Sequence, residues 1–170
     1  MAEENSKFED KTKILKIWFQ DEAKFGRIND IKGCWAPSGT RPLVKHRAIR
    51  QYSYVYSAVA PYTGENFNLI MPYANTVCMK MSLHELSRTY PNRNLLIFMD
   101  QAGWHKSNDL EISQNIRLSY IPPYSPELNP TENYWKFIRG TFFRNKYFDS
   151  FEQLEELLYS SLILLYHSYK

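Results

Sequence analysis

Features that mark secreted, zinc-binding or membrane proteins are scarce in this sequence. It has two cysteines, Cys34 and Cys78, and neither has a second cysteine or a histidine cluster beside it, so no disulfide framework or zinc knuckle is expected. The longest apolar runs, such as 95–99, are far too short to cross a bilayer, and the charged N-terminus lacks the apolar core of a signal peptide. We therefore expect a cytoplasmic protein with reduced thiols and no membrane contact.

A large excess of charge is also absent. Lysine and arginine number 21 against 18 acidic residues, which is too mild a balance to indicate a nucleic-acid-binding protein by itself. The distribution is more informative, because the stretch 41–50 carries Arg41, Lys45, Arg47 and Arg50 without an acid. These cations suit a phosphate backbone, and a solvated basic loop is an equal alternative.

Length and composition fit one folded domain. A chain of 170 residues buries enough surface to fold without disulfides or structural metals. Hydrophobic residues make up 44% and aromatic residues 16% of the sequence, which excludes disorder as its general state. No repeat, linker or low-complexity segment divides the chain, so we treat residues 1–170 as a single domain.

Hydrophobic patterning predicts strands in the first half. Residues 14–20 are β-branched and aromatic and predict a buried strand that has Asp21 at its carboxyl end. In 33–44, turn residues flank short apolar pieces, which favours a second strand or a hairpin arm. Residues 52–60 and 67–71 predict a hairpin with a loop of about six residues.

The second half predicts alternating helices and strands. Helical spacing indicates a crossover helix over 77–90, and an apolar run over 95–99 is typical of a central parallel strand. A short helix around 108–114 and a strand over 116–121 follow.

Two helices close the predicted fold. Asn129 is a good N-cap with Pro130 at the first helical position, and this helix is expected to reach about residue 146. Ser150 and Gln153 form a capping box for the last helix. The expected order is that of an α/β, ribonuclease H-like domain, with a mixed five-stranded sheet flanked by helices. The residues expected to be buried in these helices are Tyr134 or Trp135, Ile138, Phe142, Leu154, Leu157, Leu158, Leu162 and Leu165.

Three acids stand where their side chains can share a cleft. Asp21 and Asp100 follow predicted strands, and Glu132 lies in the first turn of a predicted helix. If the first and fourth strands pair in parallel, their ends lie about 4.8 Å apart, and a helix crossing that edge adds the third carboxylate. Such acids favour hard cations such as Mg²⁺ or Mn²⁺. Two ions about 3.5 to 4 Å apart would drive an in-line phosphodiester displacement.

Each acid also has a plainer interpretation. Glu132 is favoured by the helix dipole near a cap at Asn129, whether or not it binds a metal. Asp21 and Asp100 could simply begin turns. Glu22 could serve in place of Asp21, but strand alternation points only one of the two into the cleft, and we choose Asp21.

Three segments of the chain resemble the catalytic blocks of mariner-superfamily transposases, in the branch of bacterial insertion sequences. They are FQDEAKFG at 19–26, LLIFMDQAGWHKS at 95–107 and LSYIPPYSPELNPTENYWKFIR at 118–139. The third is the most specific, because its proline-rich run is long and compositionally unusual. The similarity extends from about residue 14 to residue 165.

This resemblance implies a retroviral integrase-like fold in which Asp21, Asp100 and Glu132 bind two Mg²⁺ ions, with Mn²⁺ as a substitute, and cut and join double-stranded DNA. His105 matches a histidine of the second block, and His105 and Lys106 are expected to contact DNA, although a structural hydrogen bond would equally explain the histidine. Trp104 and the segment 122–126 are expected to shape the cleft wall or to pack. Gln101 stands where many relatives have asparagine, which puts in doubt any contact assigned to that amide.

Relatives carry a helix-turn-helix region ahead of the catalytic domain, whereas the first strand begins here by residue 14. The resemblance therefore implies either a catalytic half that works with a separate helix-turn-helix polypeptide, or a fragment of a decayed element. It also suggests a homodimer in a bacterial cytoplasm, associated with the nucleoid. A ribonuclease H-like nuclease without strand transfer and an inactive remnant stay open as alternatives.

Overall fold

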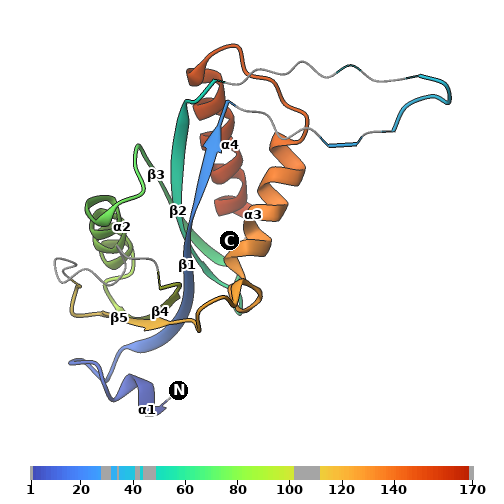
Figure 1. Cartoon of the computed structure of the whole chain (residues 1–170). Helices are drawn as coiled ribbons and strands as arrows, with labels where there is room; N and C mark the ends of the chain where they lie inside the picture. Colours follow the sequence, from blue (N-terminus) through green and yellow to red (C-terminus); the bar gives the residue numbers. More distant parts are fainter. Residues whose placement is uncertain are drawn as a thin grey trace.

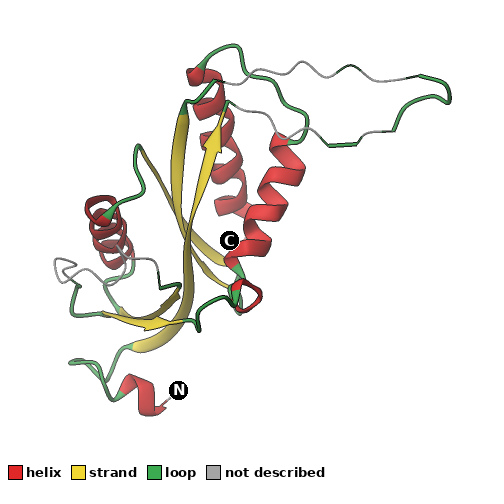
Figure 2. Ribbon diagram, in the orientation of Figure 1, coloured by secondary structure: helices red, strands yellow, loops and turns green. Residues whose placement is uncertain are grey.

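A five-stranded mixed sheet forms the centre of the molecule, with helices on both of its faces (Figure 1, Figure 2). The computed structural model describes residues 2–27, 32–33, 35–40, 43, 49–101 and 112–168. In chain order the elements are α1 (Ala2–Asn5), β1 (Ile14–Gly26), β2 (Tyr52–Ala60), β3 (Glu65–Met71), α2 (Thr76–Thr89), β4 (Arg93–Met99), β5 (Ile116–Tyr120), a 3₁₀ turn (Pro126–Leu128), α3 (Thr131–Ile138), a π-helical turn (Arg139–Phe143) and α4 (Phe151–Ser168). The strand order is β3-β2-β1-β4-β5, which confirms the predicted fold class.

The central strand β1 has different partners along its length. Its first part, from Ile14 to Phe19, pairs in parallel with β4, and its second part, from Phe19 to Gly26, pairs antiparallel with β2. The prediction that this strand ends before Asp21 is therefore wrong. Asp21 stays within the strand because β2 continues the pairing, with Ser57 opposite Asp21, after β4 has ended.

The two faces of the sheet bury separate cores. On one face α2 covers Trp18, Leu95 and Ile97, and these join a core with Met79 and Leu83 of the helix. The amphipathic pattern of α2 explains this packing, since its apolar side chains recur at helical spacing. Its observed bounds agree with the helix predicted over 77–90 to within one residue at each end.

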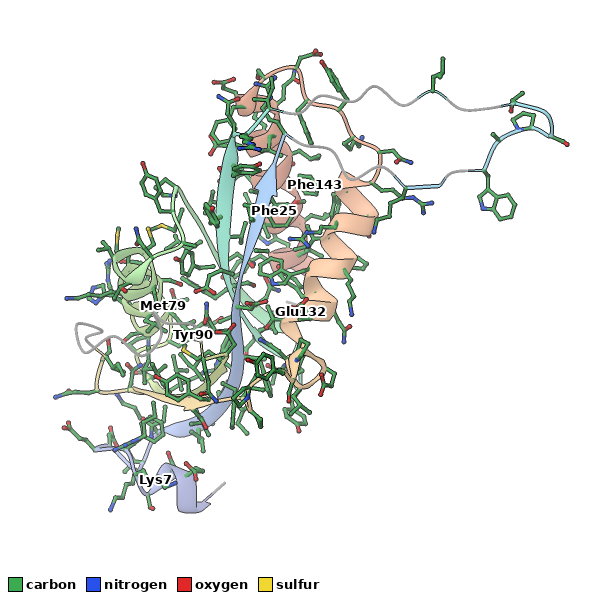
Figure 3. All side chains as sticks on the ribbon, viewed as in Figure 1. Lys7, Phe25, Met79, Tyr90, Glu132 and Phe143 are labelled. Atoms are coloured by element: carbon green, nitrogen blue, oxygen red, sulfur yellow. The ribbon has the colours of Figure 1, made fainter. Side chains whose placement is uncertain are left out.

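On the other face α3 and α4 pack over the second half of β1 and over β2 (Figure 1). Figure 3 shows Phe25 of β1 beside Phe143, and their ring centroids are 5.0 Å apart. Helix α3 does not continue to residue 146 as predicted, because the π-helical turn follows Ile138. A π-helical turn spaces equivalent positions five residues apart, so Phe143 is buried where regular spacing predicted Phe142.

Other predicted elements had different outcomes. The described residues of 33–44 contain a turn at Pro37–Thr40 instead of a strand, because proline and glycine interrupt the short apolar pieces there. The helix predicted over 108–114 lies mostly outside the described residues, and 112–114 are not helical. The strand β3 begins at Glu65, so the hairpin loop is shorter than predicted. Within the part of the chain that the structure describes, no helix is long and apolar enough to cross a membrane.

The last helix confirms its predicted apolar stripe. Leu154, Leu158, Leu162 and Leu165 are buried against the sheet, and Leu157 is half-buried beside them. The N–H of Gln153 donates to Oγ of Ser150, as a capping box requires. The side chain of Gln153 accepts from the N–H of Asp149 instead of from Ser150, so the reciprocal bond is displaced by one residue.

Candidate active site

The three predicted acids line one cleft at the edge where β4 ends. The parallel pairing of β1 and β4 ends with Phe19 opposite Phe98. If this register is continued by two residues beyond the last pair, Asp21 lies opposite Asp100. Glu132 lies at the beginning of α3, beside β1 (Figure 3). The cleft has a volume of about 390 Å³ and is lined by the three acids, by Gln101 and Asn129, and by the segment 121–126.

Buried hydrogen bonds join the start of α3 to β1. The side chain of Asn129 donates from Nδ2 to the carbonyl of Gln20 at 3.2 Å, and Oγ1 of Thr131 donates to the carbonyl of Phe19 at 2.9 Å. Asn129 also accepts the N–H of Thr131 at Oδ1, at 3.1 Å, although α3 begins at Thr131 with Pro130 as its N-cap, one residue later than predicted. Because Glu132 follows directly, these contacts fix its backbone next to β1.

The Asp21 carboxylate is held by two hydrogen bonds. Oδ2 accepts from Nε1 of Trp135 at 3.0 Å, and Oδ1 accepts from the N–H of Glu22 at 2.9 Å. Burial, followed by the negative charge of Glu22, raises the pKa of Asp21 to about 7, although the two hydrogen bonds lower it. The negative charge of Glu132 raises this pKa further. The charged form of Asp21 is thus disfavoured in this acidic, buried environment, and a nearby cation would stabilise it.

The oxygen donors fit a hard divalent cation. Carboxylates are the ligands that Mg²⁺ and Mn²⁺ prefer, and such an ion would offset the burial and the negative charges of Glu22 and Glu132 that raise the pKa of Asp21. Among the described residues, no three Asp, Glu, His or Cys side chains lie close enough to hold one ion as they stand. In this conformation the Asp21 carboxylate is instead bonded to Trp135 and to the backbone.

The proline-rich segment forms the opposite wall of the cleft. It begins where Ile121 donates its N–H to the carbonyl of Met99, and Gln101 donates from Nε2 to the carbonyl of Ile121 at 3.0 Å. Tyr124, between the prolines of this wall, is fully exposed and has a φ of 59°. The amide at position 101 thus connects the ends of β4 and β5.

Of the residues expected to contact DNA, Arg50 lies in the described part of the chain, where it is exposed just before β2. Arg41, Lys45, Arg47, His105 and Lys106 lie outside the described residues, and so does Trp104.

Sequence reasoning missed the contact between Trp135 and Asp21. Trp135 was expected only as part of a buried stripe, and no pattern in the sequence indicates a bond between residues this far apart. The polar tip of the indole is the one available signal, because a buried Trp N–H usually finds an acceptor.

The strand order and the position of the cleft define a ribonuclease H-like domain. Residues 16–155 match the family of DDE superfamily endonucleases, and the chain belongs to this family. It is similar to the uncharacterized protein y4pE/y4sA of Sinorhizobium fredii, with 36% identity over 104 residues, which cover 61% of this chain and 77% of that protein.

Solved structures show the same fold. The Mos1 transposase chain in a pre-cleavage transpososome superimposes with a TM-score of 0.66 at 17% identity, and the match covers 85% of this chain and 47% of the Mos1 chain. A Mos1 mariner paired end complex with Mn gives 0.63 at 15% identity, covering 91% and 53%. The HTLV-2 integrase catalytic core domain in complex with magnesium gives 0.55 at 12% identity, covering 86% and 83%. The chain spans about half the length of the Mos1 chains it matches.

Proposed function

We propose that this chain is the catalytic domain of a cut-and-paste DNA transposase, which cleaves a phosphodiester bond and joins the freed strand to a new site. The observation that carries the proposal is that Asp21, Asp100 and Glu132, from three separate elements, line one cleft in a chain of the DDE superfamily endonucleases. The resemblance of the third sequence block to mariner transposases favours transposition over simple hydrolysis.

Asp21, Asp100 and Glu132 would hold two divalent cations, and such ions supply Lewis-acid activation of a water or a sugar hydroxyl at the phosphodiester. The remaining contributions come from the chain itself. Trp135 and the Glu22 amide orient the Asp21 carboxylate, and Asn129 and Thr131 hold the helix that carries Glu132. The Mos1 complexes with Mn and with Mg support the choice of cation, with Mg²⁺ as the ion used and Mn²⁺ as its substitute.

The partner of this site would be double-stranded DNA. Similar chains were solved as transpososomes and paired-end complexes, which supports binding of element ends by two copies of the chain. Specific recognition of those ends would need a DNA-reading element such as a helix-turn-helix region, in addition to the catalytic cleft. Contacts of the catalytic cleft alone with DNA should be weak and sensitive to salt.

A strand-transfer assay tests the proposal. The chain is incubated with Mg²⁺, a supercoiled target plasmid and a duplex oligonucleotide with a recessed 3′ hydroxyl, and covalent joining of the oligonucleotide to the plasmid is expected. Asp100→Asn should abolish joining and cleavage with no change in the far-UV circular dichroism spectrum, because the carboxylate is exposed and its loss removes a cation ligand. Cleavage without joining would indicate a nuclease, and neither activity in Mg²⁺ or Mn²⁺ would indicate an inactive remnant.

A further inference from the structure

Tyr124 presents an aromatic ring from the wall of the catalytic cleft. The residue lines the same cleft as the three acids, yet its relative exposure is 101%. An aromatic side chain usually buries much of its surface, so a ring kept in solvent at a binding site is available to a ligand. A phenol ring is flat and amphipathic, which suits stacking against another flat group.

The backbone of Tyr124 adopts an unfavourable conformation. A φ of 59° lies in the left-handed region, where glycine and asparagine are common and a bulky residue is strained. The prolines at 122, 123 and 126 restrict the chain on both sides. Oγ of Ser125 also donates to the carbonyl of Pro123 at 3.3 Å, and the 3₁₀ turn begins at once. The backbone that carries the ring is therefore restricted before any ligand arrives.

We propose that Tyr124 is a stacking platform for an unpaired nucleobase of the DNA next to the phosphodiester that is cut. This proposal rests on the proposed function, since it assumes that DNA enters this cleft. Within a duplex both faces of a base are covered by its neighbours, so the ring can stack only on a base that has left the helix. Stacking does not depend on base identity, and one stacked base contributes about 1–3 kcal/mol to binding.

Tyr124→Asn is the informative variant, because asparagine tolerates a left-handed φ and removes the ring without adding strain. Tyr124→Phe keeps the ring. Tyr62→Asn is the matched control, because Tyr62 is 87% exposed in the turn between β2 and β3, outside the lining of the cleft. All three variants should unfold at the temperature of the wild type or slightly above it.

Each full-length variant is titrated without divalent metal into two probes, a blunt duplex and the same duplex with a short single-stranded extension containing 2-aminopurine. We expect Tyr124→Asn to bind the extended duplex about 5- to 100-fold more weakly, and to lose the quenching of 2-aminopurine fluorescence that the wild type produces. Tyr124→Phe and Tyr62→Asn should behave as wild type, and all four proteins should bind the blunt duplex equally.

Equal quenching by Tyr124→Asn and the wild type would overturn the stacking proposal, and so would an equal loss of affinity for both probes. Cleavage by the wild type in Mg²⁺ is measured separately. If the wild type does not cut DNA but quenching still depends on the ring, the proposed function fails and the stacking site stands. If the wild type cuts DNA and quenching is independent of the ring, the proposed function stands and the stacking proposal fails.

Discussion

The indole of Trp135 donates a 3.0 Å hydrogen bond to the carboxylate of Asp21, and Trp135 stands three residues after Glu132 on the same helix. The helix that carries Glu132 thus also holds Asp21, through the buried side chain of Trp135. The contact orients Asp21 and also favours its charged form, because the N–H donor lowers the pKa that burial raises.

Replacing Trp135 by phenylalanine should weaken the response to Mg²⁺ without unfolding the chain. The ring keeps most of its packing against Phe25, but Asp21 loses its donor. Because a hydrogen bond to a charged group contributes about 1.5–3 kcal/mol, the Mg²⁺ concentration for half-maximal cleavage should rise roughly tenfold or more. Trp18→Phe is the control, since Trp18 is fully buried in the opposite core and its Nε1 has no hydrogen-bond partner among the described residues. An equal rise of the half-maximal Mg²⁺ concentration in both variants would show that general core packing is responsible for it.

Asp21→Asn should stabilise the metal-free fold at alkaline pH. The folded-state pKa of Asp21, about 7, lies above the ordinary aspartate value of 3.8, so between these pH values the folded state keeps a proton that the unfolded state has lost. The wild type therefore loses stability as pH rises from about 4 to about 7, and the asparagine variant lacks this loss. Thermal unfolding in EDTA should give the variant the higher midpoint at about pH 8, with the difference narrowing toward pH 5.

The same titration predicts that metal binding releases protons. Below about pH 7 a cation must displace the proton of Asp21, so the affinity for Mg²⁺ should fall as the pH decreases. Calorimetric titrations in buffers with different ionisation enthalpies measure the protons released. If Asp21→Asn released as many protons as the wild type, Asp21 would not be the group that gives up its proton when Mg²⁺ binds.

Asn129→Ala should lower both stability and activity. The substitution leaves the buried carbonyl of Gln20 and the N–H of Thr131 without their side-chain partner, which costs about 2 kcal/mol or more in the free energy of unfolding. Cleavage should fall as well, because the helix start that carries Glu132 loses an anchor. Asn133→Ala, at an exposed position of the same helix, should change neither urea unfolding nor cleavage by a comparable amount.

Lys136→Ala should weaken DNA binding equally for all sequences. Lys136 is exposed one helical turn after Glu132, on the same side of α3, where it can meet a phosphate near the cleft. The slope of log affinity against log salt should decrease by about 1. Lys11→Ala removes the same charge from an exposed position ahead of β1 and should leave the slope unchanged. Identical slopes for both variants would exclude α3 as a contact surface.

Much of the fold could be predicted because its signals are local. The apolar run of β4 and the leucine spacing of α4 each specify their element within a few residues of chain. The length of β1 could not be predicted in this way, because the acids at 21 and 22 look like the end of a strand until β2 is known to pair with them. Tertiary pairing overrides local preference there.

In the site too, local sequence signals predict some features and not others. The positions of Asp100 and Glu132 on the cleft follow from a strand end and a helix start, which the sequence marks, whereas Asp21 reaches the same cleft from within β1. The bonds from Asn129 and Trp135 to β1 depend on how α3 lies across the sheet, and they join residues more than a hundred positions apart. Patterns within short windows carry no information on such contacts.

Asp21 and Glu132 sit on elements joined by buried hydrogen bonds, whereas Asp100 is exposed where β4 ends, next to the bond from Gln101 to Ile121. The conformational entropy lost on capturing a cation is therefore reduced where the backbones that carry Asp21 and Glu132 are already fixed. The amide at position 101 limits that loss in advance by restricting the backbone beside Asp100. Metal affinity can consequently be tuned at a residue that never touches the ion.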